Sequence, residues 1–400
     1  MKEGWEYKRL KDVATFTRGL TYSKNDEAEI SNNIVLRSNN VDLSTGKLNF
    51  DELKYLRPEF SIPEEKKVKK GSLLMCMSNG SKIHLGKVAL INEDYPYAFG
   101  GFMALVTPNE ELSPQFFHYS LSSPEYKSFI KKLSEGANIN NIKVKELELF
   151  TIPIPPLSEQ QSIVDYLDSA FAKIDAMKAN AEKRLNEAKA LFQASLKEML
   201  EPKEGWEEKK LKEVVASITD GDHQPPPKSD DGIPFITISN IDKNSNKIVF
   251  GETFYVPQSY YCALKKDRIP QQGDVLYTVT GSFGIPVLVD FQKEFCFQRH
   301  IALIRPNKGL LSSTYLFYWI LSSYATSQAE DTATGAAQRT VSLNSLRNFT
   351  INFPPLSEQQ SIVETLDSLK SKVDRLQENY EKISQECDAL KQAILRQVFE

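Results

Sequence analysis

The sequence contains a long internal repeat, and this repeat constrains the fold more than any other feature. The ten residues from Gly4 to Val13 return from Gly205 to Val214 with seven of ten positions identical. The fifteen residues from Pro155 to Ser169 return from Pro354 to Ser368 with thirteen identical. Both displacements are close to half of the 400-residue chain. An ordered match of this length predicts two copies of one fold.

Between these anchors the similarity is weaker, but it keeps its order. Matched segments are mostly apolar, Gly or Pro, as in Asn40-Val41-Asp42 against Asn240-Ile241-Asp242, whereas the polar residues between them differ. Short β-branched and aromatic runs such as 34–36, 235–238 and 275–279, separated by turn residues, predict strands. Segments 116–121 and 315–321 are better explained as packed helices. The two copies therefore have either different targets or surfaces that merely drifted after duplication.

A long helix is predicted at the end of each half. The proline pairs Pro155-Pro156 and Pro354-Pro355 disfavour helix before them, and no Gly or Pro occurs from there to about residue 199 or, in the second half, to residue 400. Ser158 and Ser357 are expected N-caps, because their hydroxyls can accept backbone N–H bonds. Each helix has about 40 residues and a length of ~60 Å.

Both helices show apolar residues at alternating spacings of four and three, which is typical of coiled coils. The predicted seam of the second helix is Ile362, Leu366, Leu369, Val373, Leu376, Tyr380, Ile383, Cys387, Leu390 and Ile394. The predicted seam of the first is Ile163, Leu167, Ala170, Ile174, Met177, Ala181, Arg184, Ala188 and Leu191. We expect the two helices to pair with each other. If a two-fold axis relates the halves, the pair is antiparallel, and the two modules lie at opposite ends of a rod.

These patterns predict an α+β chain: two similar α/β domains separated by a pair of long antiparallel coiled-coil helices, with a pseudo-two-fold internal repeat. The composition, with 40% hydrophobic and 26% charged residues, is that of a globular protein. Residues 1–200 carry 27 basic and 27 acidic side chains and residues 201–400 carry 22 and 26, so neither half is strongly basic. Without a signal-peptide core or an apolar stretch of ~18 residues, we expect a cytoplasmic protein and no membrane partner.

The sequence contains no complete catalytic motif of a known type. The four cysteines are scattered, the four histidines show no metal-ligand spacing, and neither a dinucleotide loop nor a nuclease motif is present. Segment 80–88 resembles a phosphate-binding loop but has the wrong spacing, and Val88 replaces the Ser or Thr that would hold magnesium. We therefore expect no catalytic residue, no metal site and no cofactor in this chain. A site assembled from distant residues would escape such a search.

The duplicated Gly-Trp-Glu blocks, the Pro-Pro-Leu-Ser-Glu-Gln-Gln-Ser-Ile-Val opening of each long helix and the two spacer helices resemble the specificity subunit of type I restriction–modification systems. The resemblance implies a target-recognition domain at 1–156, a central spacer helix at 157–200, a second target-recognition domain at 201–355 and a C-terminal spacer helix at 356–400. It implies a non-catalytic subunit that reads a bipartite, non-palindromic site in double-stranded DNA, one half-site per domain.

The resemblance also implies partners. Two adenine-N6 methyltransferase subunits dock along the helices in that family, with or without restriction subunits. S-adenosylmethionine, and ATP with magnesium, are then cofactors of the partner subunits. Two other classes stay open on the residues alone: a coiled-coil adaptor that bridges proteins, and a stand-alone enzyme with an unrecognised site.

Candidate DNA-contacting residues are polar side chains in predicted loops near matched landmarks, since Arg and Lys bind guanine or phosphate and Asn and Gln bind adenine. In the first domain they are Arg37, Ser38, Asn39, Ser78, Asn79, Lys82, Lys87, Asn138, Asn140 and Lys143. In the second they are Thr237, Ser239, Thr280, Ser282, Arg299, Gln338, Arg339 and Ser342. Gln338 and Arg339 are the strongest candidates, because they follow a Gly-led polar segment.

Four residues in the first turns of the long helices are candidates for subunit binding: Glu159, Gln160, Glu358 and Gln359. We expect them to be exposed. They either contact methyltransferase subunits or serve only to initiate the helix, where acidic side chains are favoured by the helix dipole.

Overall fold

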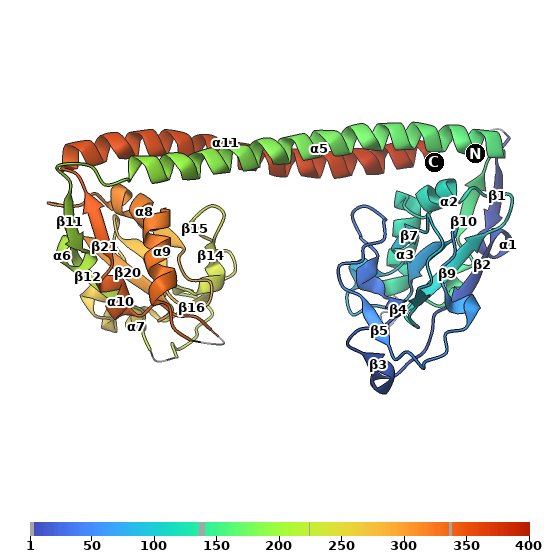
Figure 1. Ribbon diagram of the computed structural model, residues 1–400, viewed down its shortest axis with the longest axis horizontal. Helices are drawn as coiled ribbons and strands as arrows, with labels where there is room; N and C mark the ends of the chain where they lie inside the picture. Colours follow the sequence, from blue (N-terminus) through green and yellow to red (C-terminus); the bar gives the residue numbers. More distant parts are fainter. Residues whose placement is uncertain (1–3, 136–140, 224, 336–337) are drawn as a thin grey trace. The chain divides into compact units, whose positions relative to one another are not determined.

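The structure is a computed structural model that describes residues 4–135, 141–223, 225–335 and 338–400. The chain forms two compact units (Figure 1). Unit 1 comprises Met1–Asn180 together with Lys382–Glu400, and unit 2 comprises Ala181–Glu381. Each unit therefore contains one α/β domain and a portion of both long helices.

In unit 1, short strands form two four-stranded sheets and one two-stranded pair. The sheet orders are β2-β9-β6-β7, which is antiparallel, and β3-β5-β4-β8, in which β4 and β8 run parallel, while β1 pairs with β10. The strands are β1 (Glu6–Arg9), β2 (Ala14–Arg18), β3 (Glu27–Ala28), β4 (Asn33–Leu36), β5 (Lys54–Leu56), β6 (Leu73–Cys76), β7 (Val88–Leu90), β8 (Ala98–Phe99), β9 (Met103–Pro108) and β10 (Thr151–Ile154). The helices are α1 (Leu10–Val13), α2 (Pro114–Ser120), α3 (Pro124–Glu135), α4 (Val144–Leu147) and the start of α5 (Leu157–Met199).

Unit 2 repeats this plan. Its sheets have the orders β12-β20-β17-β18 and β16-β13-β19, and the two-stranded pairs are β11-β21 and β14-β15. The strands are β11 (Glu207–Lys210), β12 (Val215–Asp220), β13 (Ile233–Ile236), β14 (Ile241–Asp242), β15 (Lys247–Ile248), β16 (Phe254–Val256), β17 (Val275–Thr278), β18 (Pro286–Leu288), β19 (Cys296–Phe297), β20 (Ile301–Pro306) and β21 (Thr350–Phe353). The helices are α6 (Leu211–Val214), α7 (Gln258–Ala263), α8 (Ser313–Leu321), α9 (Ser323–Thr332), α10 (Leu343–Arg347) and the start of α11 (Leu356–Phe399).

The core of each unit includes the end of the long helix that starts in the other half of the sequence. In unit 1, Leu395 and Phe399 of α11 are buried, and the Phe399 ring lies 5.3 Å from that of Phe116 on α2, between centroids. In unit 2, Phe192 of α5 lies 6.3 Å from Tyr318 on α8. The predicted packed helices at 116–121 and 315–321 are thus confirmed as α2 and α8, and each supports a helix end.

The two long helices run antiparallel, as predicted. In unit 1, Asp175 pairs with Lys391, and the Lys178 ammonium lies 3.4 Å from the Asp388 carboxylate, so the partner number falls as the α5 number rises. Cys387 is 6% exposed and its Sγ faces the Ile174 carbonyl, which confirms it as a seam residue. Across the described residues, no helix has the apolar length needed to span a membrane.

The predicted seam of α5 is wrong in one of its two rows. The row through Leu167, Ile174, Ala181 and Ala188 faces inward, but the other row is Val164, Phe171, Lys178, Leu185 and Phe192. Leu185 and Phe192 are 3% and 5% exposed, whereas the predicted Met177 and Leu191 are 60% and 62% exposed. In α11 the predicted Leu390 is 48% exposed, and Leu395 is buried instead. Rows that start with a spacing of four residues and rows that start with a spacing of three have the same seven-residue repeat, so the sequence pattern fits both. The inward packing of the Phe171 and Phe192 rings selects the row that contains them.

A pair of neighbouring core positions differs sharply between the two domains. In unit 1, Ser72 and Thr107 share a hydroxyl–hydroxyl hydrogen bond of 2.8 Å. At the matching strand positions of unit 2, the guanidinium of Arg305 donates two hydrogen bonds of 2.9 and 2.8 Å to the carboxylate of Asp274, which is 2% exposed. The second domain therefore contains a bidentate ion pair where the first has two hydroxyls.

Arg305→Met is predicted to lower the free energy of unfolding of unit 2 by about 3 kcal/mol, because it leaves the Asp274 carboxylate buried without its counter-ion. The double variant Asp274→Ser with Arg305→Thr, which installs the pair found in unit 1, should recover most of this loss. Urea unfolding followed by tryptophan fluorescence measures both. If Arg305→Met were as stable as the parent chain, the ion pair would not contribute to the stability of unit 2.

Candidate nucleic-acid interface

In unit 1, four loop segments that are distant in sequence meet where the strands of both large sheets end. Ser78, after β6, bridges to Asn141, and the amide of Asn79 donates a hydrogen bond of 2.8 Å to the Ser38 hydroxyl. The turn 100–102 joins the same group, because the Phe102 carbonyl accepts hydrogen bonds from the backbone N–H groups of Met77 and Ser78. We call segments 37–40, 78–84, 100–102 and 141–143 loop cluster 1.

The equivalent segments of unit 2 meet in the same way. Thr280 bridges to Thr340, and the N–H of Gly281 donates to the Arg339 carbonyl at 3.0 Å. In the turn 298–300, the Gln298 N–H donates to Ile236 and the His300 carbonyl accepts from Val279. Segments 237–240, 280–284, 298–300 and 338–342 form loop cluster 2. Most of the candidate residues predicted from sequence therefore come together in each domain.

A buried asparagine holds one loop of each cluster. Asn40 and Asn240 are 0% and 4% exposed, and their side-chain oxygens accept the N–H groups of Arg37 and Thr237 at 2.8 and 2.9 Å. Their amide groups donate to carbonyls of the segment that follows, as from Asn40 to Glu52. Sequence reasoning missed these positioning residues, although the repeated Asn-Val-Asp and Asn-Ile-Asp triplets were the signal.

The predicted DNA-contacting residues of the first domain differ in their surroundings. Asn39, Lys82 and Lys143 are exposed, whereas Arg37, Ser38, Ser78 and Asn79 are half-buried. Lys87 is half-buried, and its ammonium donates a hydrogen bond of 2.7 Å to the Val41 carbonyl. Because burial lowers the pKa of this ammonium and its charge is used inside the domain, Lys87 is better described as a structural residue. Asn138 and Asn140 lie outside the described residues.

In the second domain, Ser239, Ser282, Arg299, Gln338, Arg339 and Ser342 are exposed, Thr237 is half-buried and Thr280 is buried. Arg339 is held in place, because its guanidinium lies 5.4 Å from the Phe283 ring centroid and donates to the Glu330 carbonyl at 2.7 Å. Ser342 is the N-cap of α10 and accepts the Ser345 N–H. Burial of Thr280 and capping by Ser342 assign structural roles to these two residues.

The duplicated helix openings fasten each long helix to its own domain. Gln160 and Gln359 are both 0% exposed, so the expectation that they are exposed is wrong. The Gln160 amide accepts the Ser113 N–H at 2.8 Å and donates to the Glu111 and Pro155 carbonyls at 2.8 and 2.9 Å. Gln359 repeats all three bonds with Ser312, Leu310 and Pro354. These side chains are fully used inside the chain and are not available to a partner subunit.

The neighbouring residues of the opening are also engaged. The indole of Trp5 donates to Glu159 at 2.9 Å, and Trp206 donates to Glu358 at 3.2 Å, so the two repeated sequence motifs contact each other. About two and a half turns further along each helix, Tyr119 and Tyr318 donate to Asp168 and Asp367. Ser158 and Ser357 were expected as N-caps, but α5 and α11 begin at Leu157 and Leu356, so both serines lie within the first turn.

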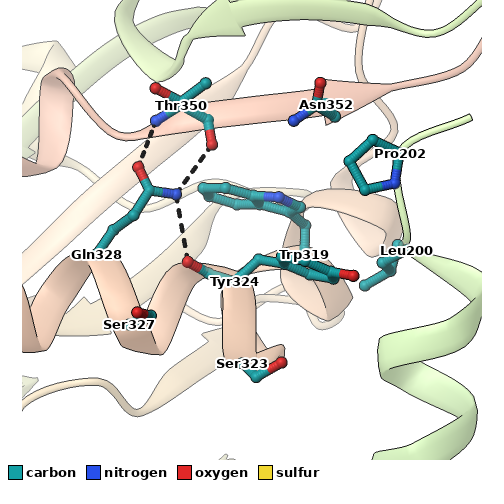
Figure 2. Close-up of a pocket in the computed structure, with 9 residues that line it drawn as sticks. All are labelled: Leu200, Pro202, Trp319, Ser323, Tyr324, Ser327, Gln328, Thr350 and Asn352. Atoms are coloured by element: carbon teal, nitrogen blue, oxygen red, sulfur yellow. Dashed lines mark hydrogen bonds between the residues drawn. The ribbon is translucent and has the colours of Figure 1, made fainter.

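A cavity in unit 2 has no catalytic character (Figure 2). Its volume is about 450 Å³, and its nine lining residues include no charged side chain. The Gln328 amide, which reaches from α9, is already bonded to the backbone of Thr350 on β21 and of Tyr324. No cluster of three potential metal-ligating side chains occurs in the part of the chain that the structure describes.

Comparison with known proteins identifies the class that this repeated fold defines. The family model described as type I restriction modification DNA specificity domain matches residues 2–187 and again 203–385. The chain therefore belongs to this family and contains two DNA specificity domains. It is a DNA-recognition subunit and not itself the catalyst of a restriction–modification system.

The chain is 28% identical to the specificity subunit of the type I restriction enzyme EcoKI from Escherichia coli K12, with 100% of this chain and 89% of the relative covered. It is 26% identical to the putative MjaX specificity subunit of Methanocaldococcus jannaschii over 95% of this chain and 90% of that protein. The HsdS subunit from Thermoanaerobacter tengcongensis shares the fold with a TM-score of 0.52 and 21% identity, over 100% of this chain and 97% of that chain. A chain from a type I restriction–modification assembly has a TM-score of 0.74 at 20% identity, over 100% and 98% of the two chains.

Gln359→Ala is predicted to lower the free energy of unfolding by about 3 kcal/mol, because one N–H and two carbonyl groups lose their partner in a dry site. Gln360→Ala is the matched control. Gln360 is the next residue and is exposed, and its side-chain amide hydrogen-bonds to Glu364 on its own helix, so its loss should cost less than about 0.5 kcal/mol. Equal losses in chemical denaturation would contradict a role for the buried amide.

Proposed function

We propose that this chain reads a bipartite, non-palindromic site in double-stranded DNA, with loop cluster 1 on one half-site and loop cluster 2 on the other. The observation that carries the proposal is one framework with two different loop surfaces. After β6 the first domain has Asn79 and Lys82, whereas the matching loop of the second domain has Gly281, Ser282 and Phe283, and the Phe283 ring packs against Arg339. A shared framework positions both clusters alike, whereas different side chains select different bases.

We further propose that two adenine-N6 methyltransferase subunits dock along the long helices, and that restriction subunits join some assemblies. The exposed apolar residues Tyr166 and Met177 of α5 in unit 1 support this, since they are 54% and 60% exposed. They lie on one stripe of the helix, because their spacing of eleven residues is about three turns. Such a stripe is suited to burial against a partner protein.

On this proposal, S-adenosylmethionine, and ATP with magnesium, are bound by the partner subunits in the cytoplasm, and the chain described here holds no cofactor. A net charge of −4 is compatible with this division, because the partners would supply part of the grip on the DNA phosphates. The competing function is a coiled-coil adaptor between proteins. Sequence-independent binding, or no binding to DNA in the presence of the methyltransferase, would favour it.

Coexpression with the cognate methyltransferase, followed by mapping of methylated adenines, tests the function. Methylation is expected in sites with two specified parts separated by an unspecified spacer. Replacing residues 5–154 by the equivalent domain of another family member should change only one part, because this segment ends before α5. The bond from Gln160 to the Pro155 carbonyl and the helix pair stay in the exchanged chain, and the backbone groups that replace those of Ser113 and Glu111 come from the matching segment of the inserted domain. A change in both parts, or methylation without sequence preference, would contradict one half-site per domain.

A further inference from the structure

The most exposed aromatic side chain on loop cluster 1 is Phe102, which is 72% exposed. It was not among the predicted contact residues, because only polar side chains were considered there. An isolated exposed apolar residue is ordinary on a protein surface, but this one occupies a turn whose backbone is fixed on three sides. The N–H groups of Gly100, Met103 and Met77 bond to Leu36, Gly100 and Phe102 respectively.

The turn owes its position to a close crossing of two chain segments. A Cβ atom on Gly19 would lie 2.0 Å from the Gly100 carbonyl oxygen, so only glycine fits there. In unit 2, a Cβ atom on Gly221 would lie 2.0 Å from the Phe297 carbonyl oxygen, which is one residue earlier in the matched segment. The parallel bridges Leu20–Gly100 and Asp222–Gln298 do match, so the turns that follow them can be compared residue by residue.

In unit 2 the position of Phe102 is occupied by His300. The Val279 N–H bonds to the His300 carbonyl at 2.9 Å, as the Met77 N–H bonds to Phe102 at 2.9 Å. Gly101 is likewise replaced by Arg299, which is exposed. Burial, followed by the charge of Arg299, lowers the pKa of His300, which favours the neutral imidazole with one donor and one acceptor. One turn is thus apolar and the other is polar and cationic.

The two turns suit different chemical groups on the edges of DNA bases. In the major groove the only apolar group that a base pair presents is the C5-methyl of thymine, whereas guanine presents two acceptors that suit arginine. Phe102 stands beside Asn79 and Ser78, which are polar candidates for base contact in the same loop cluster. An apolar ring held among polar side chains discriminates by methyl contact and not by hydrogen bonding.

We infer that Phe102 is a specificity-determining residue that packs against a thymine methyl group in the half-site read by the first domain, and that Arg299 and His300 occupy the equivalent position on the other half-site. This inference rests on the proposed function. If each half-site contains a target adenine, it contains at least one thymine, so the required methyl group is always available for testing.

The test uses the complex of the full chain with its methyltransferase and duplexes in which each thymine of the mapped first half-site is replaced in turn by uracil, which lacks the methyl group. One such replacement should weaken binding by the parent complex about tenfold. Phe102→Ala should bind the unmodified site about tenfold more weakly and lose no further affinity on that same replacement. Phe102→Leu, which keeps an apolar contact, should retain part of the sensitivity.

Controls separate this inference from folding and from the proposed function. Ile30, which is 78% exposed, lies in the turn between β3 and β4, and Ile30→Ala should keep full affinity and full sensitivity to uracil. Uracil in the second half-site should affect the parent and Phe102→Ala equally. If Phe102→Ala, with an unchanged melting temperature, keeps the parent's sensitivity at every thymine, the inference is wrong. If the parent complex has no bipartite site, the proposed function fails first.

Discussion

A fully buried glutamine at the start of each long helix is the contact on which the rest of the structure depends. Gln160 and Gln359 each bond to the strand–helix segment before α2 or α8 and to the proline that precedes their own helix. Each amide satisfies three backbone groups that would otherwise be buried without partners, and this is costly in a dry interior. The direction in which the helix leaves its domain is therefore fixed where the two repeated motifs meet.

On this common frame the two domains have diverged in polar chemistry at matched positions. A hydroxyl pair, Ser72 with Thr107, corresponds to the ion pair of Asp274 with Arg305. The turn that presents Phe102 corresponds to one that presents His300. Strand register and backbone bonding are retained in both cases, because the sheet needs them, whereas the side chains are free to change. This combination of a constant frame and variable loops suits a protein whose two halves read different sequences.

The backbone framework and the side chains that vary on it also differ in how well the sequence predicts them. The repeat, the long helices and the absence of a catalytic motif can be predicted, because each is expressed in local residue patterns. The loop residues proposed for DNA contact remain a prediction, and Lys87 and Thr280 among them are engaged within the fold. Exposure of Gln160 was wrongly predicted, since a polar residue in a first helical turn gives no local sign of the strand–helix segment that covers it.

Two copies of one unit, each followed by a long helix after a proline pair, can be predicted from the sequence alone, because a repeat and proline placement are visible in local residue patterns. Which row of α5 faces inward depends instead on contacts with other elements. Phe171 and Leu185 face inward in place of the predicted Ala170 and Arg184, because these larger apolar side chains pack against other elements of the fold. The same holds for Phe102, whose turn is bonded to Leu36 and Met77, residues distant from it in the sequence. Contacts between residues far apart in the chain have no signature in one sequence, and these contacts decide which side chains reach the surface.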